Sequence, residues 1–185
     1  MKKNIHLSNL IIYFFCCLSL LLSFYFNEDG SFLPFSMDFK DTWPYVLKLK
    51  ESFLSDPYPY TVHYPLHYYL LSRLDLIFND PLIVRLIICF ISMIVPYIFF
   101  VALREKYKNK NINILFIICI SIFFIPAFRY SSVWANDRIT TDIFILLGCY
   151  FFFKYEFSGI KNVKYLYISF LLFALACYSR QFYAV

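Results

Sequence analysis

The chain has 185 residues, of which 61% are hydrophobic and 23% aromatic, while only 16% are charged. A soluble domain of this size cannot enclose so much apolar surface in one core, because its exterior must still be covered by polar groups. The sequence therefore predicts an all-α integral membrane protein. The formal net charge of +5 is divided among short connectors next to apolar runs, a pattern typical of membrane topology and not of nucleic-acid binding.

The first apolar run covers about residues 7–26, follows Lys2 and Lys3, and is long enough to cross about 30 Å of hydrocarbon. The positions where a signal peptidase would need small residues read SFYF, so we interpret the run as a membrane anchor and not as a cleaved signal. Further runs bring the predicted spans to five, in a single module over residues 1–185. They cover about residues 82–103, 112–128, 139–153 and 165–185.

Basic residues are concentrated before the first span and in the connectors around 104–110 and 154–164. Segment 27–81, in contrast, carries more acids than bases. The positive-inside rule then places the N-terminus in the cytoplasm, and segments 27–81 and 129–138 outside. This predicts a multi-pass protein. The bias towards Ile, Phe, Tyr, Lys and Asn indicates an AT-rich genome of either bacterial or protist origin, and of the two we favour a bacterial cytoplasmic membrane. The basic residues on the predicted inner side are Lys2, Lys3, Arg104, Lys106, Lys108, Lys110, Lys154, Lys161 and Lys164.

Two amphipathic helices are expected to lie in the interface within the outer loop 27–81. The first begins near Thr42 and Pro44 and ends at Asp56 and Pro57, and the second runs from Pro65 to the stop at residues 79–81. The apolar face of the first helix comprises Trp43, Val46, Leu49 and Phe53, opposite Lys48, Lys50, Glu51 and Ser55. Between the two helices, the proline-rich stretch DPYPYTVHYP predicts an extended, aromatic-lined loop.

The carboxylates Asp38 and Asp41 follow the first span closely, at the predicted outer surface. A carboxylate that lipid and aromatic neighbours partly desolvate has a raised pKa and serves as a general base. The alternative is that the pair stabilises the N-terminus of the first interfacial helix through its dipole.

His63 and His67 have the i, i+4 spacing of zinc ligands on a helix, but Pro65 between them argues against one continuous helix. We therefore favour no metal site, while a divalent metal requirement stays open. All six cysteines fall inside apolar runs, and none forms a C-x-x-C pair, which indicates packing residues.

The outer connector and the final span add further polar residues on the same predicted side. Asp142 falls one turn into a span, where a carboxylate is costly unless it faces a cavity or a partner such as Arg138, four residues earlier. A self-contained ion pair between these two residues is the alternative to a binding role. Arg180 lies near the outer end of the last span.

Taken together, four motifs resemble the multi-spanning glycosyltransferases of the GT-C fold: MDFKD at 37–41, HYPLHYYLL at 63–71, R-x-T-T-D at 138–142, and the closing YSRQFYAV. The Met37-Asp38 and Arg180-Gln181 pairs are most similar to the M-D-E and R-Q-T motifs of the dolichyl-phosphate-glucose-dependent alpha-1,2-glucosyltransferases. Phe39 stands where that family has a second acid, and Phe182 where it has a threonine.

The resemblance implies a partial GT-C module, the amino-terminal part of a longer inverting hexosyltransferase of the cell envelope. Its donor would be a polyprenyl-phosphate-linked sugar, its acceptor a glycan, lipid or protein, and its surroundings membrane lipid. The catalytic residues so implied are Asp38 and Asp41. The substrate-binding residues are His63, Tyr64, His67, Arg138, Asp142, Arg180 and Gln181, with Tyr64, Tyr68 and Trp134 available to stack on sugars. The rival hypothesis is a non-enzymatic membrane component of polysaccharide or lipid export or assembly.

Overall fold

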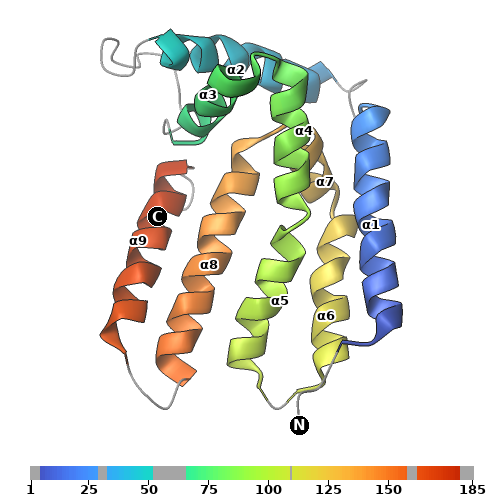
Figure 1. Cartoon of the computed structure of the whole chain (residues 1–185), viewed down its shortest axis with the longest axis vertical. Helices are drawn as coiled ribbons and strands as arrows, with labels where there is room; N and C mark the ends of the chain where they lie inside the picture. Colours follow the sequence, from blue (N-terminus) through green and yellow to red (C-terminus); the bar gives the residue numbers. More distant parts are fainter. Residues whose placement is uncertain (1–4, 29–32, 52–65, 109, 158–161, 180–185) are drawn as a thin grey trace.

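The computed structural model describes residues 5–28, 33–51, 66–108, 110–157 and 162–179, and every element in these ranges is a helix (Figure 1). The predicted all-helical fold is thereby confirmed. The helices are α1 (Leu7–Tyr25), α2 (Leu33–Glu51), α3 (Leu66–Phe78), α4 (Pro81–Ser92), α5 (Val95–Lys106), α6 (Ile112–Ile120), the 3-10 helix η1 (Ser121–Phe124), α7 (Pro126–Val133), α8 (Asp137–Phe157) and α9 (Val163–Ser179).

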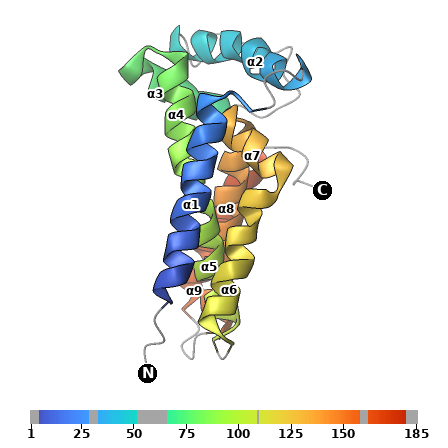
Figure 2. The ribbon, with the colours of Figure 1, turned by 90° about the vertical axis from the view of Figure 1, so that its right-hand side faces the viewer.

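The long helices stand side by side in a row, in the order α9, α8, α4 with α5, α6 with α7, and α1 (Figure 1). Helices α2 and α3 pack on each other and lie across one end of this row, which we call the capped end (Figures 1 and 2). The start of α1, the last turns of α5 and α8 and the first turns of α6 and α9 lie at the opposite end, which we call the basic end (Figure 1). Its described basic residues are Arg104, Lys106, Lys108, Lys110, Lys154 and Lys164.

Two helices in the described chain are long and apolar enough to cross a membrane, Leu7–Tyr25 and the α4–α5 stretch Pro81–Lys106. A third is added if α6, η1 and α7 count as one span, although its two parts meet at an angle of 66°. Large apolar side chains are exposed along the row, among them Phe14, Phe15, Phe170 and Leu171. Such surface is tolerated in lipid and not in water, so the membrane prediction is supported.

Both interruptions of the long helices occur next to a proline. Helix α4 ends at Ser92 and α5 starts at Val95, directly before Pro96, while η1 ends at Phe124 before Pro126. Proline lacks the N–H that continues a helix, and its ring clashes with the preceding turn. The predicted span over 112–128 is therefore not straight but bends near residue 125.

Helix α2 starts earlier than its sequence predicts, at Leu33 instead of Thr42, and Pro44 lies inside it. Its inward face begins at Phe39, whose ring lies 5.1 Å from that of Trp43, and continues through the buried Val46 and Leu49. This continuous packing face explains why the helix runs through Thr42 and Pro44, where its start was predicted. Asp38 and Asp41 consequently lie within a helix, and not in the turn before one.

Lys50 also differs from its predicted place on the solvent face of α2. Its Nζ is 2.8 Å from Oδ2 of Asp75 in α3, whose side chain is 3% exposed, and 2.8 Å from Oδ1 of Asn79. The long lysine side chain reaches across to a buried acid that helical periodicity within α2 does not show. This ion pair holds the two capping helices together.

Aromatic rings fill the core between α1, α5, α6 and α7. Phe100 and Phe116 meet edge to face at 5.1 Å, and Tyr13 lies 5.9 Å from Phe116 and 5.8 Å from Phe123. Phe123 in turn contacts Phe128 of α7 at 5.8 Å. Edge-to-face pairs of this kind add to the stabilisation from burial and fix the relative positions of helices.

Candidate functional site

Two helix ends meet at the capped end, and each is closed by a residue in the left-handed conformation. Asn27 follows α1 with φ 49°, and the N–H of Glu28 donates to the carbonyl of Ser23 at 2.8 Å. Ala135 follows α7 with φ 50°, and the N–H of Asn136 donates to the carbonyl of Ser131 at 3.0 Å. Both are Schellman motifs, which end a helix sharply and turn the next residues aside.

Arg85 of α4 lies between these two helix ends and is only 8% exposed. Its Nε donates to the carbonyl of Val133 at 3.1 Å, and its Nη2 donates to Oδ1 of Asn27 at 3.2 Å. Its guanidinium carbon lies 4.0 Å from the centre of the Trp134 ring. Two further rings, those of Phe24 and Phe39, lie 5.2 and 5.5 Å away.

Among the residues whose side chains the structure describes, no carboxylate forms an ion pair with the Arg85 guanidinium. The charge is instead stabilised by aromatic faces and by the carbonyl-bearing C-terminus of α7, where the helix dipole is negative. Sequence reasoning missed this residue, although an arginine inside the apolar run 82–103 is itself a signal of function. The run was interpreted only as a membrane span.

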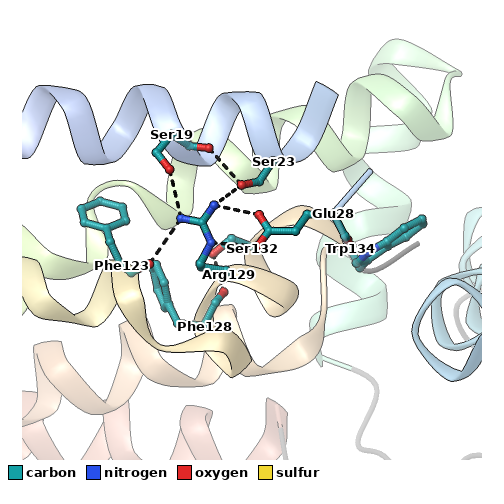
Figure 3. A network of polar contacts seen from close by, with 8 residues as sticks. All are labelled: Ser19, Ser23, Glu28, Phe123, Phe128, Arg129, Ser132 and Trp134. Atoms are coloured by element: carbon teal, nitrogen blue, oxygen red, sulfur yellow. Dashed lines mark hydrogen bonds and ion pairs between the residues drawn. The ribbon is translucent and has the colours of Figure 1, made fainter. Parts of the chain in front are cut away.

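Arg129 of α7 forms a second cationic centre, next to the end of α1 (Figure 3). Its Nε and Nη2 donate to the two carboxylate oxygens of Glu28 at 3.1 and 2.7 Å, a bidentate ion pair. Nη1 donates to Oγ of Ser19 at 3.3 Å and to the carbonyl of Phe123 at 3.4 Å, and Nη2 also donates to Oγ of Ser23. Five acceptors therefore fix the plane of this guanidinium.

Glu28 and Trp134 connect the two arginines. The indole N–H of Trp134 donates to the carbonyl of Glu28 at 3.1 Å, while the face of the same ring covers Arg85. The hydrogen bonds from Arg129 hold the pKa of the Glu28 carboxyl below its usual value, against a smaller opposing effect of burial. The ion pair with Arg129 thus favours the charged form of this carboxylate.

His67 of α3 is 1% exposed and joins α3 to the α7–α8 turn. Its Nε2 lies 2.8 Å from the carbonyl of Ala135, and its Nδ1 lies 2.8 Å from Oγ1 of Thr140. Because a carbonyl only accepts, Nε2 carries the proton, and in the neutral ring Nδ1 accepts from the threonine hydroxyl. Both nitrogens of this predicted binding residue are already engaged.

A small polar cavity borders His67, with a volume of about 10 Å³, enough for roughly one water molecule. It brings together residues from α2, α3 and the α7–α8 turn, which are far apart in sequence. Its lining residues are Phe39, Thr42, His67, Tyr68, Trp134, Ala135, Asn136 and Asp137. The cavity shows where the predicted motifs converge, but a sugar ring does not fit into it.

Other predicted site residues occupy separate positions. Arg138 and Asp142 form the expected i, i+4 pair, with Nε and Oδ2 3.8 Å apart. Asp41 is exposed, on the outward face of α2 with Lys40 and Lys48. Trp134, expected to stack on a sugar, has one ring face covered by Arg85.

The remaining predicted site residues lie outside what the structure describes. His63, Tyr64, Arg180 and Gln181 fall outside the described ranges, and for Asp38 only its backbone within α2 is described. Within the described ranges, no group of three or more His, Cys, Asp and Glu side chains is arranged to hold a metal ion. Comparison of the chain with known protein families, characterised proteins and solved structures finds no match.

Proposed function

We propose that this chain contributes the site of a membrane glycosyltransferase that moves a sugar from a polyprenyl-phosphate donor to an acceptor at the capped end. In this proposal five spans cross the cytoplasmic membrane, the N-terminus is cytoplasmic, and α2 and α3 lie in the outer interface. The cluster of basic residues at the opposite end supports this orientation, because such residues are typical of the cytoplasmic side.

The observation that carries the proposal is the position of α2 over Arg85. Phe39, the residue directly after Asp38, has its ring 5.5 Å from the Arg85 guanidinium. Helix α2 thus brings the backbone that follows Asp38 close to a buried arginine at the capped end. Sugar transfer from a lipid phosphate needs a base and a cation near the same reacting group.

In the proposed reaction, Asp38 accepts the proton of an acceptor hydroxyl as its oxygen attacks the anomeric carbon. The bond between that carbon and the phosphate oxygen breaks, its electron pair stays on the lipid phosphate, and the configuration at carbon is inverted. Guanidinium groups stabilise the negative charge of the departing phosphate through paired N–H donors. We assign the stabilisation of the departing phosphate to Arg85 and Arg129, in addition to Arg138 and Arg180.

One observation favours the rival function, a non-enzymatic component of polysaccharide or lipid export or assembly. The polar cavity at the capped end holds only about one water, and both ring nitrogens of His67 are engaged. In that case the capped end is a packed structural joint, and the carboxylates of α2 stabilise the helix surface.

The Asp38→Asn variant distinguishes the two functions. In membranes from an expressing strain, transfer of labelled hexose from a polyprenyl-phosphate donor should fall at least about a hundredfold, since a general base contributes about 10²–10⁴ in rate. Lys48→Gln, an exposed change on the same helix, serves as the matched control and should retain transfer. If Asp38→Asn transfers sugar as well as the wild type, the proposed chemistry is wrong and the rival function is favoured.

A further inference from the structure

Two lysine side chains at the basic end lie over aromatic rings of α8 and α9. Nζ of Lys106, in α5, is 5.3 Å from the centre of the Phe153 ring, and Nζ of Lys154 is 4.7 Å from the centre of the Tyr165 ring. Lys154 directly follows Phe153 in α8, so both ammonium groups lie at the last two turns of that helix. We call these two lysines and two rings the lysine surface.

A hydrogen bond joins the ends of α5 and α8 next to this surface. Nζ of Lys108 donates to the carbonyl of Phe157 at 3.0 Å and also pairs with Glu105, 3.4 Å away. The contact satisfies a carbonyl at the C-terminus of α8 and holds the end of α5 against it. Lys106 and Lys154 therefore belong to two helices whose ends are fixed to each other.

The charge of the lysine surface is not neutralised within the described chain. Neither Lys106 nor Lys154 forms an ion pair with a carboxylate whose side chain the structure describes. Lys154 donates to the hydroxyl of Tyr150 at 3.4 Å, which is a neutral partner. In the described part of the basic end, the basic residues outnumber the acids, which are Glu105 and Glu156. An anionic partner is therefore attracted to this surface.

The surroundings of the lysine surface are those of a membrane boundary. Phe152 of α8 and Ile168 of α9 are exposed apolar side chains on the same helices, and Tyr107 and Tyr167 are exposed beside them in sequence. Tyrosine is enriched at the level of the lipid head groups, where its ring is partly in hydrocarbon and its hydroxyl in water. A lysine at this level lays its apolar stem on neighbouring rings and holds its ammonium group among the phosphates.

We infer that the lysine surface binds the head groups of anionic phospholipids in the leaflet that the basic end faces. Phosphate oxygens accept charge-assisted hydrogen bonds from ammonium groups, and a head group with net negative charge supplies the counter-charge that the chain lacks. A zwitterionic head group carries an ammonium of its own, which the two lysines repel. The surface therefore selects lipids by the charge of the head group and not by their acyl chains.

A membrane lipid fits this surface better than a soluble anion does. Exposed ammonium groups hold a free ion weakly, because water solvates both charges and salt screens them. The bilayer, in contrast, keeps head groups beside the lysines at a high effective concentration. The inference is independent of the proposed sugar transfer, since no residue of the capped end enters it.

Native mass spectrometry of the purified full chain in non-ionic detergent tests the inference. The chain is offered equal amounts of dioleoyl phosphatidylglycerol and dioleoyl phosphatidylethanolamine, which have the same acyl chains. We expect about twentyfold preferential retention of phosphatidylglycerol, because each basic residue near an anionic lipid contributes about fivefold. The preference should fall as the ammonium acetate concentration rises. Glycerol phosphate, an anionic head group without chains, should not be retained.

Variants assign the preference to the lysine surface. Lys106→Gln and Lys154→Gln each remove one charge and should each lower the preference about fivefold. Lys106→Arg keeps the charge and should retain the preference. Lys48→Gln, an exposed change on α2 at the capped end, is the matched control and should also retain it.

Equal retention of the two phospholipids overturns the selection by charge, and equal retention of glycerol phosphate overturns the assignment to membrane lipid. If Lys48→Gln lowers the preference as much as Lys106→Gln does, the binding surface is not at the basic end. Sugar transfer and its dependence on Asp38 concern only the capped end. Failure of either proposal therefore leaves the other standing.

Discussion

The two ends of the helical row use cationic side chains in opposite ways. At the capped end, Arg85 is buried among three aromatic rings and Arg129 has five acceptors. At the basic end, the cations lie at the surface over ring faces, as with Lys106, 5.3 Å from the Phe153 ring, and Lys154, 4.7 Å from the Tyr165 ring.

The two ends therefore differ in how tightly the positions of their cationic side chains are constrained. Lysines at a membrane boundary lay their apolar stems on neighbouring rings and leave the charge near water, which needs no exact geometry. A buried guanidinium must be paired in every direction, because an unsatisfied charge in a low-dielectric environment is strongly destabilising. Matched substitutions at the two ends should therefore have very different effects.

The largest difference is expected between two acid-to-amide changes. Asp75→Asn removes the charge that Lys50 faces and should lower the free energy of unfolding by about 3 kcal/mol, since the acid is 3% exposed. Glu105→Gln breaks the exposed pair with Lys108 at the basic end and should cost about 0.5 kcal/mol. Thermal unfolding in detergent is the measurement, and equal losses would contradict the comparison.

Arginine-to-lysine changes should show the next largest contrast. Arg85→Lys keeps the charge but cannot both stack on Trp134 and donate to two acceptors, so we expect a loss of about 2 kcal/mol. Arg104→Lys, at the exposed end of α5, should change stability by less than about 0.5 kcal/mol. A tolerated Arg85→Lys would mean that only the charge at this position matters.

His67→Phe should cost about 1.5 kcal/mol, because it leaves the buried carbonyl of Ala135 without its donor while Thr140 can turn to a backbone carbonyl of its own helix. His6→Phe, at the start of α1, is the matched change at the basic end. The His6 side chain forms no capping hydrogen bond there, so little effect is expected. The same unfolding measurement applies, and a greater loss at His6 would reverse the assignment.

The smallest effect concerns pH. The pKa of Glu28 is lowered in the folded protein by Arg129, so the pair's contribution is fully present above the ordinary value of 4.5 and is lost as the pH falls below it. Between about pH 5 and about pH 3, where such a contribution is lost, wild-type melting temperature should fall slightly more than that of Glu28→Gln. Glu156→Gln at the basic end should follow the wild type, and an unchanged slope in Glu28→Gln would contradict the prediction.

Several local features were predictable because they depend on neighbours in sequence. The helix Leu66–Phe78 ends near the predicted Asn79-Asp80-Pro81 stop, where Asp80 caps α4 through the N–H of Leu82 at 2.8 Å. The i, i+4 pair of Arg138 and Asp142 follows from helical spacing alone. Helix α2 was predicted only in part, because it starts at Leu33, before the local start signals at Thr42 and Pro44.

The candidate site was predicted less well, since its contacts join residues far apart in the chain. Sequence reasoning selected His67 and Trp134, yet it assigned them to a ligand, whereas their described contacts are with Ala135, Thr140 and Arg85. It overlooked Arg85 altogether, although its place in an apolar run was a visible signal. The role of Asp38 stays a prediction.

By itself, the sequence determined the all-helical class, the membrane environment and the separation of basic residues from the acidic loop, because composition and apolar run length act locally. Only the tertiary structure decided that Arg85 and Arg129 lie at one end, joined through Trp134 and Glu28. The two arginines are 44 positions apart in sequence, and no sequence pattern links them. Their connection depends on where the ends of α1 and α7 meet in the fold.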